Sequence, residues 1–238
     1  MDIKGKRALV IGGTSGIGLA AARMLGEKGA ELFVMSRSEN NRATAQKVLG
    51  QDASIRQLDV LDRDGMASLF AELAPFDILV NAATGGERAT GPFMEMDLDG
   101  FTGSFAKLWG YVNSVRLAGE HLSERGCIVL VSGSPARKCQ PGMSAISTVG
   151  NAVEGFSRAI AAEIAPKRLN VVAPGTIDTP MFPVEGQARE AFLERAGANA
   201  LMQRVGTADE VAAGIIFAIE NDYVTGTTID VDGGALLP

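Results

Sequence analysis

The sequence predicts an α/β fold, a doubly wound parallel sheet of about seven strands with helices on both faces. Three observations lead to this prediction. Short β-rich segments alternate with helical patterns, several of these strands are apolar on both faces, and a glycine-rich turn follows the first strand. We expect one domain over residues 1–238, because neither a repeat nor a linker interrupts the alternation.

The elements follow from apolar spacing and from the turn residues between them. Strand patterns cover residues 7–11, 31–36, 54–59, 77–82, 127–132, 169–173 and 227–231. Helical patterns cover residues 16–28, 40–49, 62–73, 100–123, 145–165 and 207–220. The irregular stretches 83–99 and 174–206 each follow the carboxyl end of a strand, where folds of this class bind ligands.

Composition excludes several classes of function. Hydrophobic residues make up 46% of the chain and charged residues 21%, the net charge is −6, and no block of Lys and Arg is present. This balance argues against nucleic acid or an anionic membrane as a partner. The first strand begins close to Met1, so we expect no signal peptide and a cytoplasmic protein. Cys127 and Cys139 lack metal-ligand spacing, so we expect free thiols and no metal site.

The turn after the first strand predicts a Rossmann-like phosphate site. Gly12, Gly16 and Gly18 allow a tight turn and a close approach of backbone to ligand, and the following helix offers free N–H groups to a pyrophosphate. The predicted contacts in this turn are Gly12, Thr14, Ser15, Gly16, Ile17 and Gly18. The sequence therefore predicts a dinucleotide cofactor.

The end of the second strand favours NADP(H) over NAD(H). Ser36 and Arg37 stand where an acidic residue would bind the 2′-hydroxyl of an adenosine ribose. A carboxylate would repel a 2′-phosphate, whereas a guanidinium can bind one through two parallel hydrogen bonds.

With these motifs in order, the chain resembles the short-chain dehydrogenase/reductase family over essentially its whole length. The segment "LDVLD" is similar to the family segment whose Asp faces the adenine, and "VVAPGTIDTPMF" is similar to the Pro-Gly segment that holds the nicotinamide carboxamide. The segment "ILVNAAT" resembles the family's Asn-Asn-Ala-Gly after the fourth strand. The resemblance implies cofactor contacts at Asp59, Val60, Asn81, Ala82, Ala83, Pro174, Gly175, Ile177 and Thr179. It also implies that residues 181–198, with Met181, Phe182 and Phe192, form an apolar lid over the substrate.

The catalytic residues that the resemblance implies are replaced in this chain. The family uses an Asn, a Ser, and a Tyr followed four residues later by a Lys. Aligning these positions without gaps places Lys107, Gly133, Ile146 and Gly150 there. A shift of one residue would offer Ser132 or Ser134 as the Ser. No shift supplies the Tyr, because the chain contains just Tyr111 and Tyr223, and we expect Tyr223 to pack in its loop.

We hypothesise that Lys107 acts as a relocated cation or acid, with Ser134 and Tyr111 as candidate catalytic partners. Lys107 and Tyr111 are four residues apart and so share a helix face. In the alternative interpretation, Tyr111 packs against the sheet and Lys107 extends toward solvent or a carboxylate. Gly150 is expected to open space, Gly155 to mark a close helix contact, and Arg137 and Lys138 to be available to an anionic ligand.

Three functions remain open from the sequence. The first is an NADP(H)-dependent oxidoreductase that acts on a carbonyl or alcohol by non-standard residues. The second is a non-catalytic NADP(H)-binding protein or regulatory subunit, and the third is a lyase or isomerase on the same scaffold. Family members are usually dimers or tetramers, so the resemblance implies a homodimer or homotetramer paired through the helices at 100–123 and 145–165, or pairing with a homologous subunit.

Overall fold

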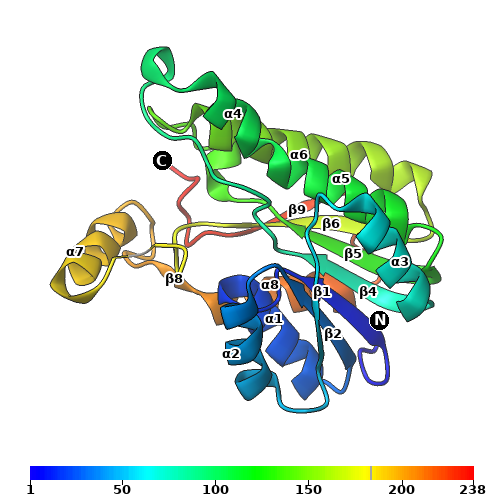
Figure 1. The fold of residues 1–238 in the computed structure, drawn as a ribbon. Coiled ribbons are helices and arrows are strands. Elements are labelled where there is room, and N and C mark those ends of the chain that lie inside the picture. The colour runs from blue at the N-terminus through cyan, green and yellow to red at the C-terminus, as the bar shows by residue number, and fades with distance from the viewer. Residues whose placement is uncertain (183) are drawn as a thin grey trace.

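The computed structural model describes residues 1–182 and 184–238, and its main sheet confirms the predicted fold class (Figure 1). Seven strands pair in parallel in the order β3-β2-β1-β4-β5-β6-β9. They are β1 (Arg7–Ile11), β2 (Glu31–Ser36), β3 (Ser54–Gln57), β4 (Phe76–Asn81), β5 (Leu122–Val131), β6 (Arg168–Pro174) and β9 (Thr228–Val231). The strand order reverses its direction between β1 and β4, which is the switch point where such sheets bind ligands.

Helices cover both faces of this sheet because its central strands are apolar on both sides. The helices are α1 (Gly16–Glu27), α2 (Glu39–Leu49), α3 (Arg63–Leu73), α4 (Leu98–Ser104), α5 (Ala106–Ala118), α6 (Ser144–Glu163), α7 (Gly186–Gly197) and α8 (Ala208–Glu220), with short 3₁₀ turns η1 (Phe93–Glu95) and η2 (Ser134–Ala136). One apolar core joins the sheet to α1 and α8, and the other joins it to α3, α5 and α6 (Figure 1). Burial of these two faces is the main favourable term in folding.

The largest departure from the predicted elements lies at residues 100–123. The expected single helix is two helices, α4 and α5, that meet at Phe105, and the second ends at Ala118. Strand β5 begins at Leu122, five residues earlier than expected, because Leu122 pairs with Phe76 before a shift of register. His121 therefore lies in the turn between α5 and β5, where its carbonyl accepts the N–H of Phe76.

Two short strands and a helix begin within the stretch 174–206, where the sequence predicts no regular structure. Strands β7 (Ile177–Asp178) and β8 (Gly206–Thr207) form a separate parallel pair, and α7 lies between them in the chain. Figure 1 shows α7 standing away from the two main helix layers. The predicted lid therefore contains a helix, although its residue 183 lies outside the described residues.

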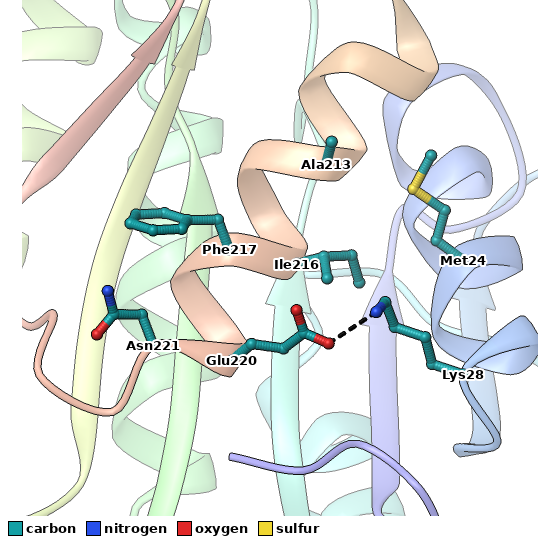
Figure 2. Close-up of a pocket in the computed structure, with 7 residues that line it drawn as sticks. All are labelled: Met24, Lys28, Ala213, Ile216, Phe217, Glu220 and Asn221. Atoms are coloured by element: carbon teal, nitrogen blue, oxygen red, sulfur yellow. Dashed lines mark hydrogen bonds and ion pairs between the residues drawn. The ribbon is translucent and has the colours of Figure 1, made fainter.

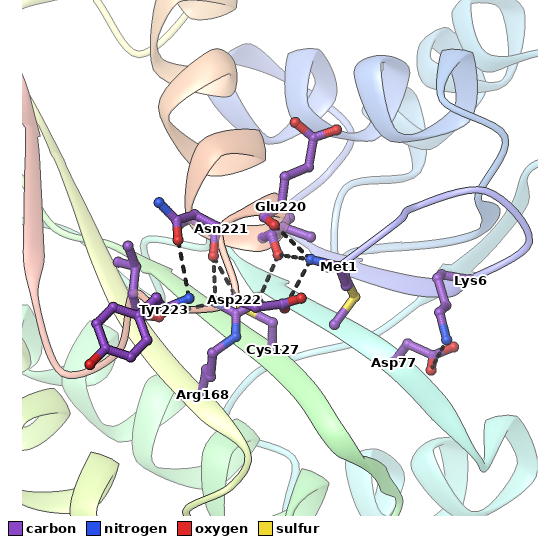
Figure 3. A network of polar contacts seen from close by, with 12 residues as sticks. Met1, Lys6, Asp77, Cys127, Arg168, Glu220, Asn221, Asp222 and Tyr223 are labelled. Atoms are coloured by element: carbon purple, nitrogen blue, oxygen red, sulfur yellow. Dashed lines mark hydrogen bonds and ion pairs between the residues drawn. The ribbon is translucent and has the colours of Figure 1, made fainter.

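A polar network joins the amino end of β6 to the end of α8 (Figure 3). This side of the sheet is opposite the carboxyl ends of the strands. The buried guanidinium of Arg168 donates to the carbonyls of Ala218 at 2.6 Å and Ile219 at 2.6 Å, and lies 3.5 Å from Asp222. The amino group of Met1 also donates to Asp222, at 2.9 Å. These donors satisfy carbonyls that the helix itself leaves without partners. Tyr223 beside them is fully exposed, so the expectation that it packs in its loop is wrong.

Candidate functional site

A cleft of about 1480 Å³ lies along the carboxyl ends of the central strands. Its walls come from the turn after β1, the end of β2, the loops after β4, β5 and β6, and helix α7. The topological switch between β1 and β4 thus coincides with the cleft. Its size is above the usual range for pockets that bind small ligands, which leaves room for both a cofactor and a substrate.

The glycine-rich turn has a shape that requires glycine. Gly12 has φ of +75°, and a Cβ there would lie 2.7 Å from the backbone nitrogen of Ala83. A Cβ on Gly18 would overlap the carbonyl of Gly12. Helix α1 begins at Gly16, and the side chain of its N-cap, Ser15, forms no capping hydrogen bond. The first N–H groups of α1 are therefore available to an anion at this end of the helix dipole.

Arg37 lies at the end of β2 on the rim of the cleft, with Ser36 beside it. Its guanidinium is 3.7 Å from the carboxylate of Asp59, and both side chains are about half exposed. A contact of this length between exposed groups contributes little to stability. Arg37 is thus held loosely toward the cleft and keeps most of its donors free. Asn41 and Thr44 of α2 line the same end of the cleft and had no signal in the sequence.

Most of the predicted cofactor residues line this one cleft. They are Gly12, Thr14, Ser15, Gly16, Ile17, Gly18, Ser36, Arg37, Val60, Ala82, Ala83, Pro174, Gly175, Ile177 and Thr179. Asp59 and Asn81 are not part of the lining. Asn81 is fully buried, donates to the hydroxyl of Ser114 at 2.9 Å and accepts the N–H of Ala83 at 3.1 Å, so it shapes the turn after β4. Asp59 instead accepts the N–H of Leu61.

Lys107 reaches the cleft from the first turn of α5. Its side chain is half-buried, and its ammonium lies 3.4 Å from the carbonyl of Ser132 and 5.6 Å from the centre of the Tyr111 ring. Among the described residues, no carboxylate lies within 4 Å of this ammonium. Burial, reinforced by the positive charge of Arg88, lowers the pKa of Lys107 to about 8. Lys107 is therefore a titratable group facing the space where a substrate would lie.

Tyr111 is not part of the cleft lining, which corrects the hypothesis that it is a catalytic partner. Its side chain is fully buried in the core between the sheet and α5, and its hydroxyl donates to the carbonyl of Val131 at 2.8 Å. Burial also raises the pKa of Tyr111 above its usual range, which disfavours loss of its proton. Tyr111 supports Lys107 through the face of its ring and not through its proton.

Gly150 does not open an empty space, because Ala136 fills it. A Cβ on Gly150 would lie 2.8 Å from the Cβ of Ala136, whose own side chain is buried. The turn η2 therefore packs directly on α6. Gly133, Ser134, Ile146 and Gly150 all line the cleft near this contact. Gly155 differs, since no atom of the described residues lies within 4 Å of where its Cβ would be, so the expected close helix contact is not found among them.

Arg137 points away from the cleft, so it is not available to a ligand there. Its guanidinium contacts the buried carboxylate of Glu154 at 3.2 Å and forms a two-pronged ion pair with Asp230 of β9. Lys138 does line the cleft, but its ammonium donates to the carbonyls of Asn199 and Ala235. These contacts fix the loop after β5 to α6, to β9 and to the end of the chain.

Several cleft residues come from segments that no local pattern singled out. Arg88 follows β4, while Arg195 and Asn199 belong to α7 and its exit. Met181, Phe182 and Phe192 of the predicted lid also line the cleft, with the two phenylalanine rings 4.8 Å apart. Closure of this segment over a substrate stays a prediction.

A second, shallower hollow of about 450 Å³ lies between α1 and α8 (Figure 2). It is lined by Met24, Ile216 and Phe217, and the ion pair between Lys28 and Glu220, 2.7 Å long, crosses it. It sits at the end of α1 away from Gly16, and its two charged groups neutralise each other. In residues 1–182 and 184–238, no cluster of His, Cys, Asp and Glu could hold a metal ion. No helix of the described chain has the length and apolar character needed to cross a membrane.

Comparison with known proteins finds relatives along the entire chain. A family model described as Enoyl-(Acyl carrier protein) reductase matches residues 12–235. The 3-oxoacyl-[acyl-carrier-protein] reductase of Mus musculus is 34% identical over 240 residues, which cover 98% of each chain. A solved structure described as a short chain dehydrogenase/reductase family protein has a TM-score of 0.87 at 31% identity and is covered fully. A small-chain dehydrogenase in complex with NADPH has a TM-score of 0.84 at 29% identity, covering 99% of this chain and 100% of that one.

Proposed function

Because this chain belongs to the short-chain dehydrogenase/reductase family, we propose that it is an NADP(H)-dependent oxidoreductase acting on a carbonyl or alcohol through Lys107. The main support for this proposal is that one cleft extends from the glycine-rich turn to Lys107. The solved relative with bound NADPH supports the choice of cofactor.

The residues of the cleft suit NADPH. A Cβ at Gly12 or Gly18 would collide with neighbouring backbone atoms, so the turn keeps the shape that leaves room for a phosphate only with glycine there. The available N–H groups at the start of α1 suit a pyrophosphate. Arg37 would hold the 2′-phosphate, with Ser36 beside it. When bound, NADPH supplies a hydride to the carbonyl carbon of a substrate.

In this proposal, Lys107 provides the proton for the carbonyl oxygen. Its Nζ carries three N–H donors, and the contact with Ser132 uses one of them. A pKa of about 8 keeps the group charged at neutral pH yet able to release a proton. Ser134, which lines the cleft from η2, would hold the substrate oxygen. The positions that the family resemblance assigns to Tyr and Lys are Ile146 and Gly150, which offer no proton.

The test combines cofactor binding with turnover on one preparation. NADPH and NADH are titrated by fluorescence, and NADPH oxidation is then followed with a panel of aldehydes and ketones. We expect wild type to prefer NADPH, and Arg37→Ser to weaken NADPH by about tenfold or more while leaving NADH unchanged, because one charge-assisted contact is lost. Absence of NADPH binding would overturn the cofactor assignment.

The role of Lys107 is tested in the same assay. Lys107→Met should lower turnover by about 10²–10⁴-fold, the usual contribution of a general acid, and leave the Kd of NADPH unchanged. Lys47→Met is the matched control, because Lys47 is exposed on α2 and does not line the cleft. Equal turnover in Lys107→Met and wild type would exclude Lys107 as the acid.

A second candidate function is a protein that binds NADP(H) without turnover. The observation that favours it is the buried state of Tyr111 together with the filling of the space beside Gly150 by Ala136. Tight NADPH binding with no oxidation by any carbonyl of the panel would select it. A product formed without NADPH oxidation would instead select a lyase or isomerase on this scaffold.

A further inference from the structure

The cleft is positive although the chain as a whole is acidic. Six cationic side chains and two carboxylates line the cleft among the described residues, while the net charge of the chain is −6. A cleft of one sign of charge raises the local concentration of ligands of the other sign. The cofactor accounts for the charge at the β2 end, where Arg37 lies, but the other five cations lie elsewhere along the cleft.

Most of these other cations already have partners. Arg204 forms an ion pair with Glu210, and Lys138 donates to two backbone carbonyls. The Nε of Arg195 donates to the carbonyl of Ala191 in its own helix. In the described part of the chain, the guanidinium of Arg88 has neither an ion pair nor a hydrogen bond, and Lys107 has no carboxylate partner.

Arg88 and Lys107 also act on each other. The loop that carries Arg88 packs on the start of α5, where a Cβ on Gly85 would lie 2.7 Å from the backbone nitrogen of Lys107, and both cations line the same cleft. The positive charge of Arg88 there disfavours the charged form of Lys107. Glu87, the neighbour of Arg88 in the chain, forms no ion pair with either group in the described structure. Two like charges without a counter-ion at one side of a cleft are stabilised when an anion binds between them.

We infer that the substrate carries a carboxylate near its reacting carbonyl and that Arg88 and Lys107 bind this carboxylate. The inference rests on the proposed function and names the substrate class for that site. The guanidinium of Arg88 presents a fork of donors that matches a carboxylate. Lys107 has donors left for both the carboxylate and the adjacent carbonyl oxygen after its contact with Ser132.

The binding of such an anion depends on pH in a defined direction. The titratable neighbours of Lys107 are Arg88 from the loop after β4 and Tyr111 from its own helix. The cleft residues Ser132 of β5, Ser134 of η2 and Ile146 of α6 are neutral. Lys107 therefore controls the pH dependence, and the affinity for a carboxylate falls as the pH rises through about 8 and the ammonium loses its charge.

The test compares acids with their methyl esters by isothermal titration calorimetry, with and without saturating NADPH. The probes are pyruvate with methyl pyruvate, and phenylglyoxylate with methyl phenylglyoxylate. At pH 7 we expect each acid to bind about tenfold more tightly than its ester, which is about 1.4 kcal/mol. This preference should decrease between pH 7 and pH 9.5.

Two variants locate the effect. Arg88→Gln and Lys107→Met should each reduce the preference for the acid, whereas Arg116→Gln and Lys47→Met, which alter exposed cations outside the cleft, should keep it. Equal affinity for acids and esters, failure of every acid to bind, or a preference untouched by both cleft variants would overturn the inference. Since binding is measured without turnover and also without NADPH, failure of the proposed oxidoreductase function would be seen separately.

Discussion

Tyr111 and Lys107 lie one helical turn apart on α5, yet they occupy different environments. The hydroxyl of Tyr111 is held in the core by the carbonyl of Val131, whereas the ammonium of Lys107 reaches the cleft above the ring. The spacing in the sequence correctly places the two side chains together. It gives no information on which of the two faces the ligand, because that depends on how α5 packs on β5.

The hydrogen bond of Tyr111 gives a prediction about stability. Tyr111→Phe keeps the ring and removes the donor, so the free energy of unfolding should fall by about 1–2 kcal/mol, as for other buried hydrogen bonds. Urea denaturation measures this change. Tyr223→Phe is the control, since the Tyr223 side chain is fully exposed and should give no change. NADPH affinity should be equal in both variants, and a large loss of affinity in Tyr111→Phe would show that its hydroxyl does more than hold the core.

The lowered pKa of Lys107 predicts how stability depends on pH. The folded chain releases the proton of Lys107 near pH 8, while the unfolded chain keeps it up to about pH 10.5. Between these values the unfolded state binds more protons, so the stability of wild type should rise with pH relative to Lys107→Met. Urea midpoints at pH 7, 8, 9 and 10 for both proteins test this. A constant difference across the series would mean that Lys107 is solvated as in water.

At the scale of the element, helix α6 contains two interior glycines with opposite roles. Gly150 allows the turn η2 to approach, whereas a Cβ on Gly155 would have no atom of residues 1–182 and 184–238 within 4 Å. From the sequence both glycines simply weaken a helix. The difference comes from a contact between segments that are 14 residues apart, and apolar spacing in the helix carries no information about it.

These roles predict opposite effects of alanine. Gly150→Ala should lower the free energy of unfolding by about 1–2 kcal/mol, because the cost of overpacking against Ala136 exceeds the gain of about 1 kcal/mol in helix propensity. Gly155→Ala should raise stability by up to about 1 kcal/mol. Thermal and urea unfolding give both values. Adding Ala136→Gly to Gly150→Ala should recover most of the loss, and additivity of these two changes would show that the contact does not limit packing.

Element boundaries are predictable where turn residues such as glycine and proline mark them in the sequence, and they are not predictable elsewhere. The strands around the glycine-rich turn and the long helix α6 lie within a few residues of their predicted limits. The early start of β5 depends on pairing with β4, which is a contact distant in the chain. The sequence predicts no helix at α7, because its residues carry little apolar periodicity and bury little surface.

At the scale of the molecule, Arg168 joins the sheet to the outer helix layer. Its side chain is buried at the start of β6 and bonds the last carbonyls of α8 and that of Val224 (Figure 3). Nearby, burial raises the pKa of the Cys127 thiol to about 11, which keeps it protonated. The network lies at the end of the sheet opposite the cleft, so it serves stability and not binding.

The position of Arg168 predicts that its replacement lowers the stability of the whole fold and leaves NADPH affinity unchanged. Arg168→Met leaves several buried carbonyls without donors and should lower the free energy of unfolding by about 3–5 kcal/mol. NADPH affinity of the folded variant, measured at low temperature, should stay the same. Arg116→Met on the exposed side of α5 is the comparison and should change neither quantity. A stability loss below about 1 kcal/mol would mean that water replaces the guanidinium.

The sequence made the doubly wound fold class and the cofactor end of the cleft predictable, because these depend on strand–helix alternation and on short local motifs. The substrate end was less predictable. Lys107 was found by its position in a resembling segment, whereas Arg88 and Arg195 reach the cleft through loops and a helix with no pattern of their own. Arg137 was misplaced because its partners Glu154 and Asp230 are distant in the chain.

The contact between Ala136 and Gly150 has a consequence for the history of such a chain. A Cβ at position 150 meets the Cβ of Ala136, so the cost of enlarging residue 150 depends on which residue stands at 136, and the two substitutions are better tolerated when the change at 136 comes first. A bulky or charged residue at 150 is therefore costly as a single mutation. Directed evolution toward such a residue should therefore begin by diversifying the turn that carries Ala136.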